Sequence, residues 1–173
     1  MKNLLQKKFP ELSAKKYEDI SGWIHFGIIL MLFILFHSCF QIATVPTLSM
    51  YPELDTNEFV LAVKTKDINY GDIVLFDSPT EDAIYIKRLI GMPGDTLSIK
   101  GGKVWRNGEA LDEEYVKEYM EGDMDEITVP EGSYFMMGDN RNHSGDSRYF
   151  GPVQEEAIRS KSIFHTNPFH WFN

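Results

Sequence analysis

The sequence predicts a mostly β domain that follows one N-terminal transmembrane helix. A long apolar run near the start, with no Asp, Glu, Lys or Arg in residues 20–52, indicates the helix. Short apolar stretches separated by glycine, proline and asparagine indicate the strands. With 173 residues, 43% of them hydrophobic and 13% aromatic, the chain is long enough to form one such domain around its own core.

The central part of the apolar run, residues 23–43, has the length that a helix needs to cross a hydrocarbon layer of about 30 Å. Several lysines precede it, and the first basic residue after it is Lys64. The positive-inside rule therefore predicts a single-pass protein of the cell membrane, with a cytoplasmic tail (1–22), an anchor (23–43) and an extracytoplasmic domain (44–173). The alternative is a cleavable signal peptide with its apolar core at 28–36.

Strands are predicted at residues 58–63, 72–76, 83–90, 96–99, 103–106 and 133–137. The glycine pair at 101–102 and the Asn107-Gly108 pair are turn sequences, and the latter is a strong hairpin indicator. Residues 112–121 and 152–160 are predicted to form short helical turns. Short strands with turns at this spacing favour a small barrel or sandwich.

Charge, cysteine and histidine content exclude several classes of function. The net charge of -9 disfavours a nucleic-acid partner, because binding to phosphates requires a basic face. Cys39 is the only cysteine, so an intramolecular disulfide is impossible. The five histidines show no metal-ligand spacing, and no phosphate-binding glycine loop is present. We therefore predict no nucleic-acid partner, no metal and no cofactor.

The first candidate site is Ser49, which lies between Pro46 and Pro52. These prolines keep the chain extended or turning, and a serine in such a setting is usually an ordinary loop residue. Its position favours a functional role, because Ser49 lies six residues after residue 43, the end of the predicted anchor. Six extended residues span about 20 Å at most. A nucleophile here would work at the outer membrane surface, where an exported precursor presents the site that follows its apolar segment.

Two further segments contain residues that could take part in catalysis. Lys87 follows an alternating apolar stretch, and a lysine serves as a general base only when burial lowers its pKa from about 10.4. A solvent-facing or ion-paired lysine is the simpler interpretation of that segment alone. Residues 138–151 are dense in small polar residues, opposite charges and glycines. Taken alone, they indicate a surface loop held by Asx turns and an Asp–Arg pair.

Taken together, in this order behind one apolar run, these segments resemble the type I signal peptidase family, in its small Gram-positive form. The similar segments are residues 46–52, 71–76, 85–95 and 138–148, and the resemblance extends over about residues 20–165. It implies coiled antiparallel sheets and a membrane-bound serine endopeptidase that removes signal peptides. The partners that it implies are secretory preproteins and the lipid bilayer.

The resemblance also assigns roles by position. Ser49 is the nucleophile, Lys87 the general base and Ser144 the residue that orients the lysine. The Thr47 hydroxyl and the Ser49 backbone N–H form the oxyanion hole. A supporting charged network comprises Arg88, Asp139, Asp146 and Arg148. The substrate adds as a strand beside residues 83–86, and the substrate-binding residues are Pro46, Met50, Ala83, Ile84, Tyr85 and Ile86.

Two positions depart from the family pattern. Thr47 stands where serine is usual, and Leu48 stands where a small residue is common. An alternative function is therefore a membrane-anchored assembly factor or chaperone for a surface fibre (pilus) subunit, which keeps the peptide groove and cleaves little. The presence of Ser49, Lys87 and Ser144 argues against it, because a scaffold has no physical need for all three. A self-cleaving regulator is disfavoured by the anchor and by the absence of a DNA-binding domain.

Overall fold

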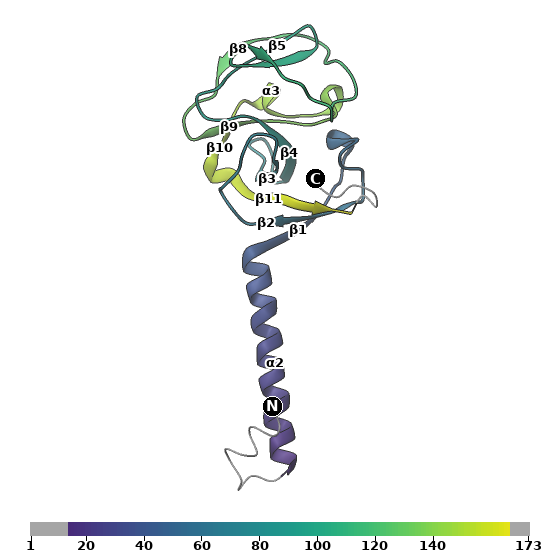
Figure 1. The fold of residues 1–173 in the computed structure, drawn as a ribbon, viewed down its shortest axis with the longest axis vertical. Helices are drawn as coiled ribbons and strands as arrows, with labels where there is room; N and C mark the ends of the chain where they lie inside the picture. Colours follow the sequence, from purple (N-terminus) through teal and green to yellow (C-terminus); the bar gives the residue numbers. More distant parts are fainter. Residues whose placement is uncertain (1–13, 167–173) are drawn as a thin grey trace. The chain divides into compact units, whose positions relative to one another are not determined.

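A computed structural model describes residues 14–166 (Figure 1). The chain divides into two compact units between Cys39 and Phe40. The first contains the helix α2 (Ala14–Cys39), in which the segment Glu18–Cys39, 22 residues, is long and apolar enough to cross a membrane. The helix ends before residues 40–43, which we expected in the anchor. They belong to strand β1 (Phe40–Thr44), because their backbone groups pair with a neighbouring strand instead of continuing the helix.

The second unit is built almost entirely from short strands. After β1 they are β2 (Phe59–Val63), β3 (Ile73–Asp77), β4 (Ile84–Gly91), β5 (Thr96–Lys100), β6 (Lys103–Arg106), β7 (Glu109–Ala110), β8 (Met124–Thr128), β9 (Ser133–Met137), β10 (Val153–Gln154) and β11 (Ile158–His165). The helical pieces are the one-turn α3 (Ser147–Phe150) and the 3₁₀ turns η1 (Leu48–Met50), η2 (Arg141–His143) and η3 (Glu155–Ala157).

These strands form two antiparallel sheets. The seven-stranded sheet has the order β1-β2-β11-β3-β4-β9-β10, and the four-stranded sheet has the order β7-β6-β5-β8. The last long strand, β11, inserts between β2 and β3, so residues from both ends of the unit share one sheet (Figure 1). The prediction of a mostly β fold with antiparallel sheets is confirmed.

All six predicted strands are present, with boundary shifts of one residue in places. The predicted hairpin is confirmed as well: Asn107 and Gly108 both have positive φ, at 55° and 83°, and join β6 to β7. The helical prediction at 112–121 is wrong. Glu113 forms an ion pair with Arg141 instead, and Tyr115 packs against the core. Of the helix predicted at 152–160, only the turn η3 forms, and residues 158–160 begin β11.

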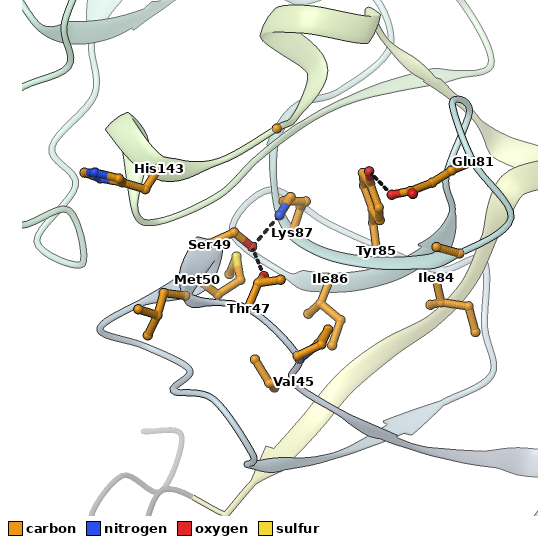
Figure 2. Close-up of a pocket in the computed structure, with 14 residues that line it drawn as sticks. Val45, Thr47, Ser49, Met50, Glu81, Ile84, Tyr85, Ile86, Lys87 and His143 are labelled. Atoms are coloured by element: carbon orange, nitrogen blue, oxygen red, sulfur yellow. Dashed lines mark hydrogen bonds between the residues drawn. The ribbon is translucent and has the colours of Figure 1, made fainter.

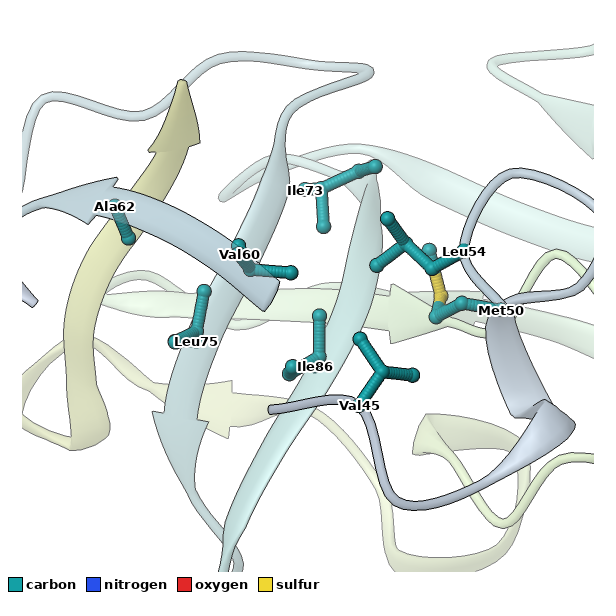
Figure 3. Close-up of a cluster of buried hydrophobic side chains, with 8 residues drawn as sticks. All are labelled: Val45, Met50, Leu54, Val60, Ala62, Ile73, Leu75 and Ile86. Carbon is teal, nitrogen blue, oxygen red and sulfur yellow. The ribbon is translucent and has the colours of Figure 1, made fainter. Parts of the chain in front are cut away.

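One buried apolar cluster fixes the segment that contains Ser49. Figure 3 shows Val45 and Met50 among core side chains of the long sheet, and both are almost fully buried. The other members of the cluster are Leu54, Val60, Ala62, Ile73, Leu75 and Ile86. Because apolar groups on either side of Ser49 are buried in one core, the serine is held against the sheet by packing on both sides.

Candidate active site

Ser49 lies on the short turn η1, directly before Met50. Asn140 holds the backbone of this turn, because its N–H donates to the Ser49 carbonyl oxygen at 3.1 Å. The Asn140 Nδ2 donates to the Leu48 carbonyl oxygen at 3.0 Å. Core packing and these two hydrogen bonds therefore fix the backbone of the turn, so that the serine hydroxyl has a defined position.

Lys87 lies in β4 and meets Ser49 across the site (Figure 2). Its Nζ atom donates to the Ser49 Oγ at 2.5 Å, and the lysine is only 5% exposed. Burial lowers the pKa of Lys87 to about 8, although the nearby Asp146 and Asp139 carboxylates oppose that shift. A lysine with such a pKa is neutral in a useful fraction of molecules near neutral pH, and the neutral amine can accept a proton from the hydroxyl.

The other predicted hydroxyl residues lie around this pair. The Thr47 Oγ1 donates to the Ser49 Oγ at 3.2 Å. The Ser144 Oγ is buried and has no hydrogen-bond partner among the described residues, so the structure contains no bond from it to Lys87. A Cβ atom at Gly138 would collide with the Ser144 side chain and with the Ser49 carbonyl oxygen. Only glycine at this position therefore lets the 138–144 loop approach Ser49 so closely.

The four residues of the predicted charged network form two pairs behind the site. Arg88 makes a two-point contact with Asp139, at 2.8 and 2.6 Å, and Arg148 makes one with Asp146, at 2.8 Å for both bonds. Burial lowers the pKa of Arg88, but its hydrogen bonds to Asp139 and the charge of that carboxylate raise it above the ordinary value overall. Both carboxylates are inaccessible to solvent, so each arginine compensates a buried charge.

These pairs also hold the backbone near Ser49. The Asp146 Oδ2 accepts a hydrogen bond from the Gly138 N–H at 3.0 Å. The sequence analysis missed a third pair, in which Arg141 contacts Glu113 at 2.6 and 2.8 Å and donates from Nε to the Gly138 carbonyl oxygen at 3.1 Å. Both backbone polar groups of Gly138 are thus bound by charged side chains. No local pattern predicts the Arg141–Glu113 pair, because the two residues are 28 positions apart.

A cleft of about 350 Å³ opens beside the Ser49–Lys87 pair (Figure 2). All six residues that we predicted to bind substrate line it: Pro46, Met50, Ala83, Ile84, Tyr85 and Ile86. Glu81 and His143 line it too, and the sequence analysis did not assign either of them a role. No metal-binding group of His, Cys, Asp and Glu residues occurs within residues 14–166.

One wall of the cleft is the free edge of β4. On one side, β4 pairs with β3 along Ile84–Arg88. On the other side, its pairing with β9 begins only at Arg88. Within the described part of the chain, residues 84–87 therefore have one edge without a partner strand. An extended peptide could pair with that edge and bring its backbone alongside the Ser49 hydroxyl.

Comparisons with known proteins agree on one family. Residues 20–166 match a family described as signal peptidase, peptidase S26. The chain is 33% identical to signal peptidase I of Bacillus licheniformis, over 92% of this chain and 95% of that protein. It is 35% identical to signal peptidase I T of Bacillus subtilis (strain 168), over 98% of this chain and 95% of that protein.

A solved structure supports the same relationship. The crystal structure of a signal peptidase I from Enterococcus faecalis V583 is 35% identical in sequence and superposes with a TM-score of 0.50. The match covers 55% of this chain and 96% of that structure. The fold, the sequence similarity and the matched family thus agree with one another.

Proposed function

Because the chain belongs to the signal peptidase family, peptidase S26, we propose that it removes signal peptides from exported preproteins with Ser49 as the nucleophile and Lys87 as the general base. Family membership makes it a serine endopeptidase of the signal peptidase I type. The observation that supports these two roles most strongly is the 2.5 Å contact between Nζ of the buried Lys87 and Oγ of Ser49. No observation favours the assembly-factor alternative.

The reaction begins when neutral Lys87 accepts the proton of the Ser49 hydroxyl. The Ser49 Oγ attacks the carbonyl carbon at the end of the signal peptide and forms a tetrahedral intermediate. The Lys87 ammonium then gives its proton to the leaving amine of the mature protein, so that the acyl-enzyme remains. A water molecule, deprotonated by Lys87, attacks the ester carbonyl, and Lys87 then returns that proton to the departing Ser49 Oγ as the signal peptide leaves.

The remaining assigned residues support these steps. The Thr47 hydroxyl and the Ser49 backbone N–H donate to the developing oxyanion, which is a major source of acceleration in acyl transfer. Ser144 orients the Lys87 amine. Its hydroxyl is buried and has no other hydrogen-bond partner among the described residues, so it is available for that role. The network of Arg88, Asp139, Asp146 and Arg148 keeps the site rigid by binding buried charges in pairs.

The substrate lies extended along the free edge of β4. Residues 83–86 provide the edge, and Pro46 and Met50 also line the cleft. Main-chain hydrogen bonds to the edge supply affinity, whereas small side-chain pockets select the A-x-A-like residues of a signal-peptide cleavage site.

We place residues 1–22 in the cytoplasm and the sheet domain outside the membrane, because basic residues precede the apolar helix and none follow it before Lys64. The domain begins at Phe40, where β1 starts. Single cysteines introduced as Asn3→Cys or Lys117→Cys in a Cys39→Ser background test this orientation. We expect an impermeant maleimide to label only the second variant in intact cells, and labelling of the first alone would reverse the topology.

The function is tested by cleavage of a preprotein with an A-x-A site in detergent or lipid vesicles. We expect the wild type to cleave at that site, and Ser49→Ala and Lys87→Met to lose more than about a thousandfold in kcat/KM. The Lys100→Met variant, changed at an exposed lysine of β5, is the matched control and should keep full activity. A folded wild type that cleaves none of several such preproteins would refute the proposal.

A further inference from the structure

Residues 84–87 form the outer half of β4, and their side chains present two chemically different faces to the cleft. Figure 2 shows Ile84 and Ile86 pointing to one side of the strand and Tyr85 pointing to the other. Successive residues of an extended peptide also alternate between the two faces of a sheet. A peptide paired with this edge therefore places every second side chain on the isoleucine face and the intervening side chain on the tyrosine face.

The cleavage motif of a signal peptide determines which residue lies on which face. In an A-x-A-like site the two small residues are separated by one position, so they share a face. The apolar face of Ile84 and Ile86 suits both of them. The middle residue, second before the scissile bond, then lies on the face of Tyr85.

A carboxylate lies at the outer end of that second face. The Tyr85 hydroxyl donates to the Glu81 Oε1 at 2.5 Å, and both residues line the cleft. Glu81 is the only acidic residue among the described residues that line it. Within the same described part, no donor reaches the Glu81 Oε2, so this oxygen can accept a hydrogen bond from a substrate.

The catalytic lysine lies over the face of the same ring. Lys87 Nζ is 5.5 Å from the centre of the Tyr85 ring and donates a hydrogen bond to Ser49, whereas Glu81 contacts the Tyr85 hydroxyl, so the two charged groups lie on different sides of the phenol (Figure 2). A substrate side chain on this face has to pass the Tyr85 ring to reach Glu81 at its hydroxyl, and lysine and arginine are the long cationic side chains that can do so. A cationic group placed there meets a carboxylate and stays away from the catalytic amine.

We propose that Glu81 is a specificity-determining residue that favours precursors with lysine or arginine at the middle position of the cleavage motif. The same carboxylate disfavours aspartate or glutamate there by like-charge repulsion. The inference rests on the proposed function, because it assumes that a precursor pairs with β4 beside Ser49. Glu81 is exposed, so the preference is moderate and weakens as salt is added.

The test compares three preproteins that differ only in having lysine, glutamine or glutamate at this middle position. For the wild type we expect kcat/KM to be about three- to tenfold higher with lysine than with glutamate, as an exposed attraction and an exposed repulsion together allow. The Glu81→Gln variant should bring that ratio close to one. The Glu81→Lys variant should invert it.

The matched control is Asp82→Asn, because it removes the same charge from the neighbouring residue, which does not line the cleft. It should keep the wild-type ratio. A wild-type ratio of one, or an equal ratio in the wild type and Glu81→Gln, would overturn the inference. Cleavage of the glutamine preprotein tests the proposed function separately. If the wild type cleaves this preprotein while its lysine-to-glutamate ratio of kcat/KM is one, only the role of Glu81 fails. If none of the three is cleaved, both fail.

Discussion

Strand β4 has an outer end, residues 84–86, and an inner end, residues 88–91. Both are extended, but their surroundings differ. From Arg88 onward the strand is buried and pairs with β9, and Arg88 and Leu89 also have backbone partners on the β3 side. Before Lys87 it is paired only with β3, and Ile84 is 37% exposed in the cleft. Lys87 lies at the boundary, with its backbone in the sheet and its amine next to Ser49.

This difference fits both roles that we propose for the strand, one in catalysis and one in substrate binding. The inner end excludes water and holds charges in fixed pairs, which is the environment that lowers the pKa of a lysine. The outer end keeps the unpaired edge that an extended substrate needs. A general base placed further inward would be out of reach of the substrate, and one placed further outward would be hydrated and remain protonated.

The largest difference that we expect between the two ends is in how much their ion pairs contribute to the free energy of unfolding. Asp139 is buried and binds Arg88 of the inner end, whereas Asp77, opposite Ile84 at the outer end, forms a half-exposed pair with Arg159. Asp139→Ala should lower the free energy of unfolding by about 4 kcal/mol, because it leaves a buried cation without its carboxylate. Asp77→Ala should lower it by less than about 1 kcal/mol.

Urea denaturation of the purified protein in detergent measures both values. Asp139→Ala should also lose activity, because Arg88 directly follows Lys87, the proposed general base. Equal losses of stability in the two variants would mean that the inner end is as hydrated as the outer one. Burial would then not be the cause of the lowered pKa of Lys87.

Burial of the charged Lys87 should lower the free energy of unfolding of the protein. Its pKa falls from 10.5 to about 8 because burial penalises the charged form. Below pH 8 the lysine is charged in both the folded and the unfolded chain, so the folded state bears the full penalty, about 3 kcal/mol. Lys87→Met should therefore be about 3 kcal/mol more stable than the wild type at pH 7, whereas Lys100→Met should not differ.

That advantage should disappear as the pH rises. Between about pH 8 and 10.5 the folded wild type loses the proton of Lys87 before the unfolded chain does, so the wild type gains stability with pH and the variant does not. Activity should follow the same ionisation and increase about tenfold per pH unit below pH 8. A stability difference that is independent of pH would show that Lys87 is not the titrating group.

The sequence was sufficient where a local pattern determines the structure. Alternating apolar residues predicted β4, and the pair Asn107 and Gly108 predicted the turn before β7, because positive φ angles are required there. The residues around Ser49 and Lys87 were predicted by their resemblance to a family rather than by spacing. The structure brings them together, although 38 positions separate the two in the chain.

The sequence was insufficient where tertiary contacts determine the structure. Strand β11 contains Arg159, Ser160 and Lys161, and its polar residues hid a strand that pairs on both edges inside the long sheet. Strand β1 was hidden by the apolar run, since nothing local marks the end of a helix there. Glu81 could not be linked to the cleft, because its role depends on how the loop before β4 returns to Tyr85.

The smallest effect that we expect follows the loss of one methylene group from Ile84 or from Ile86, which both lie on the free edge of β4. Ile84 and Ile86 lie on the same face of β4, but Ile86 is only 8% exposed and belongs to the core cluster around Val45 and Met50. Ile86→Val should lower the free energy of unfolding by about 1 kcal/mol, as deletion of a buried methylene does. Ile84→Val should change it by less than about 0.5 kcal/mol, because the lost atoms were half in water. Chemical denaturation distinguishes the two, and a larger loss for Ile84→Val would mean that the outer end of β4 is covered by protein rather than open to a substrate.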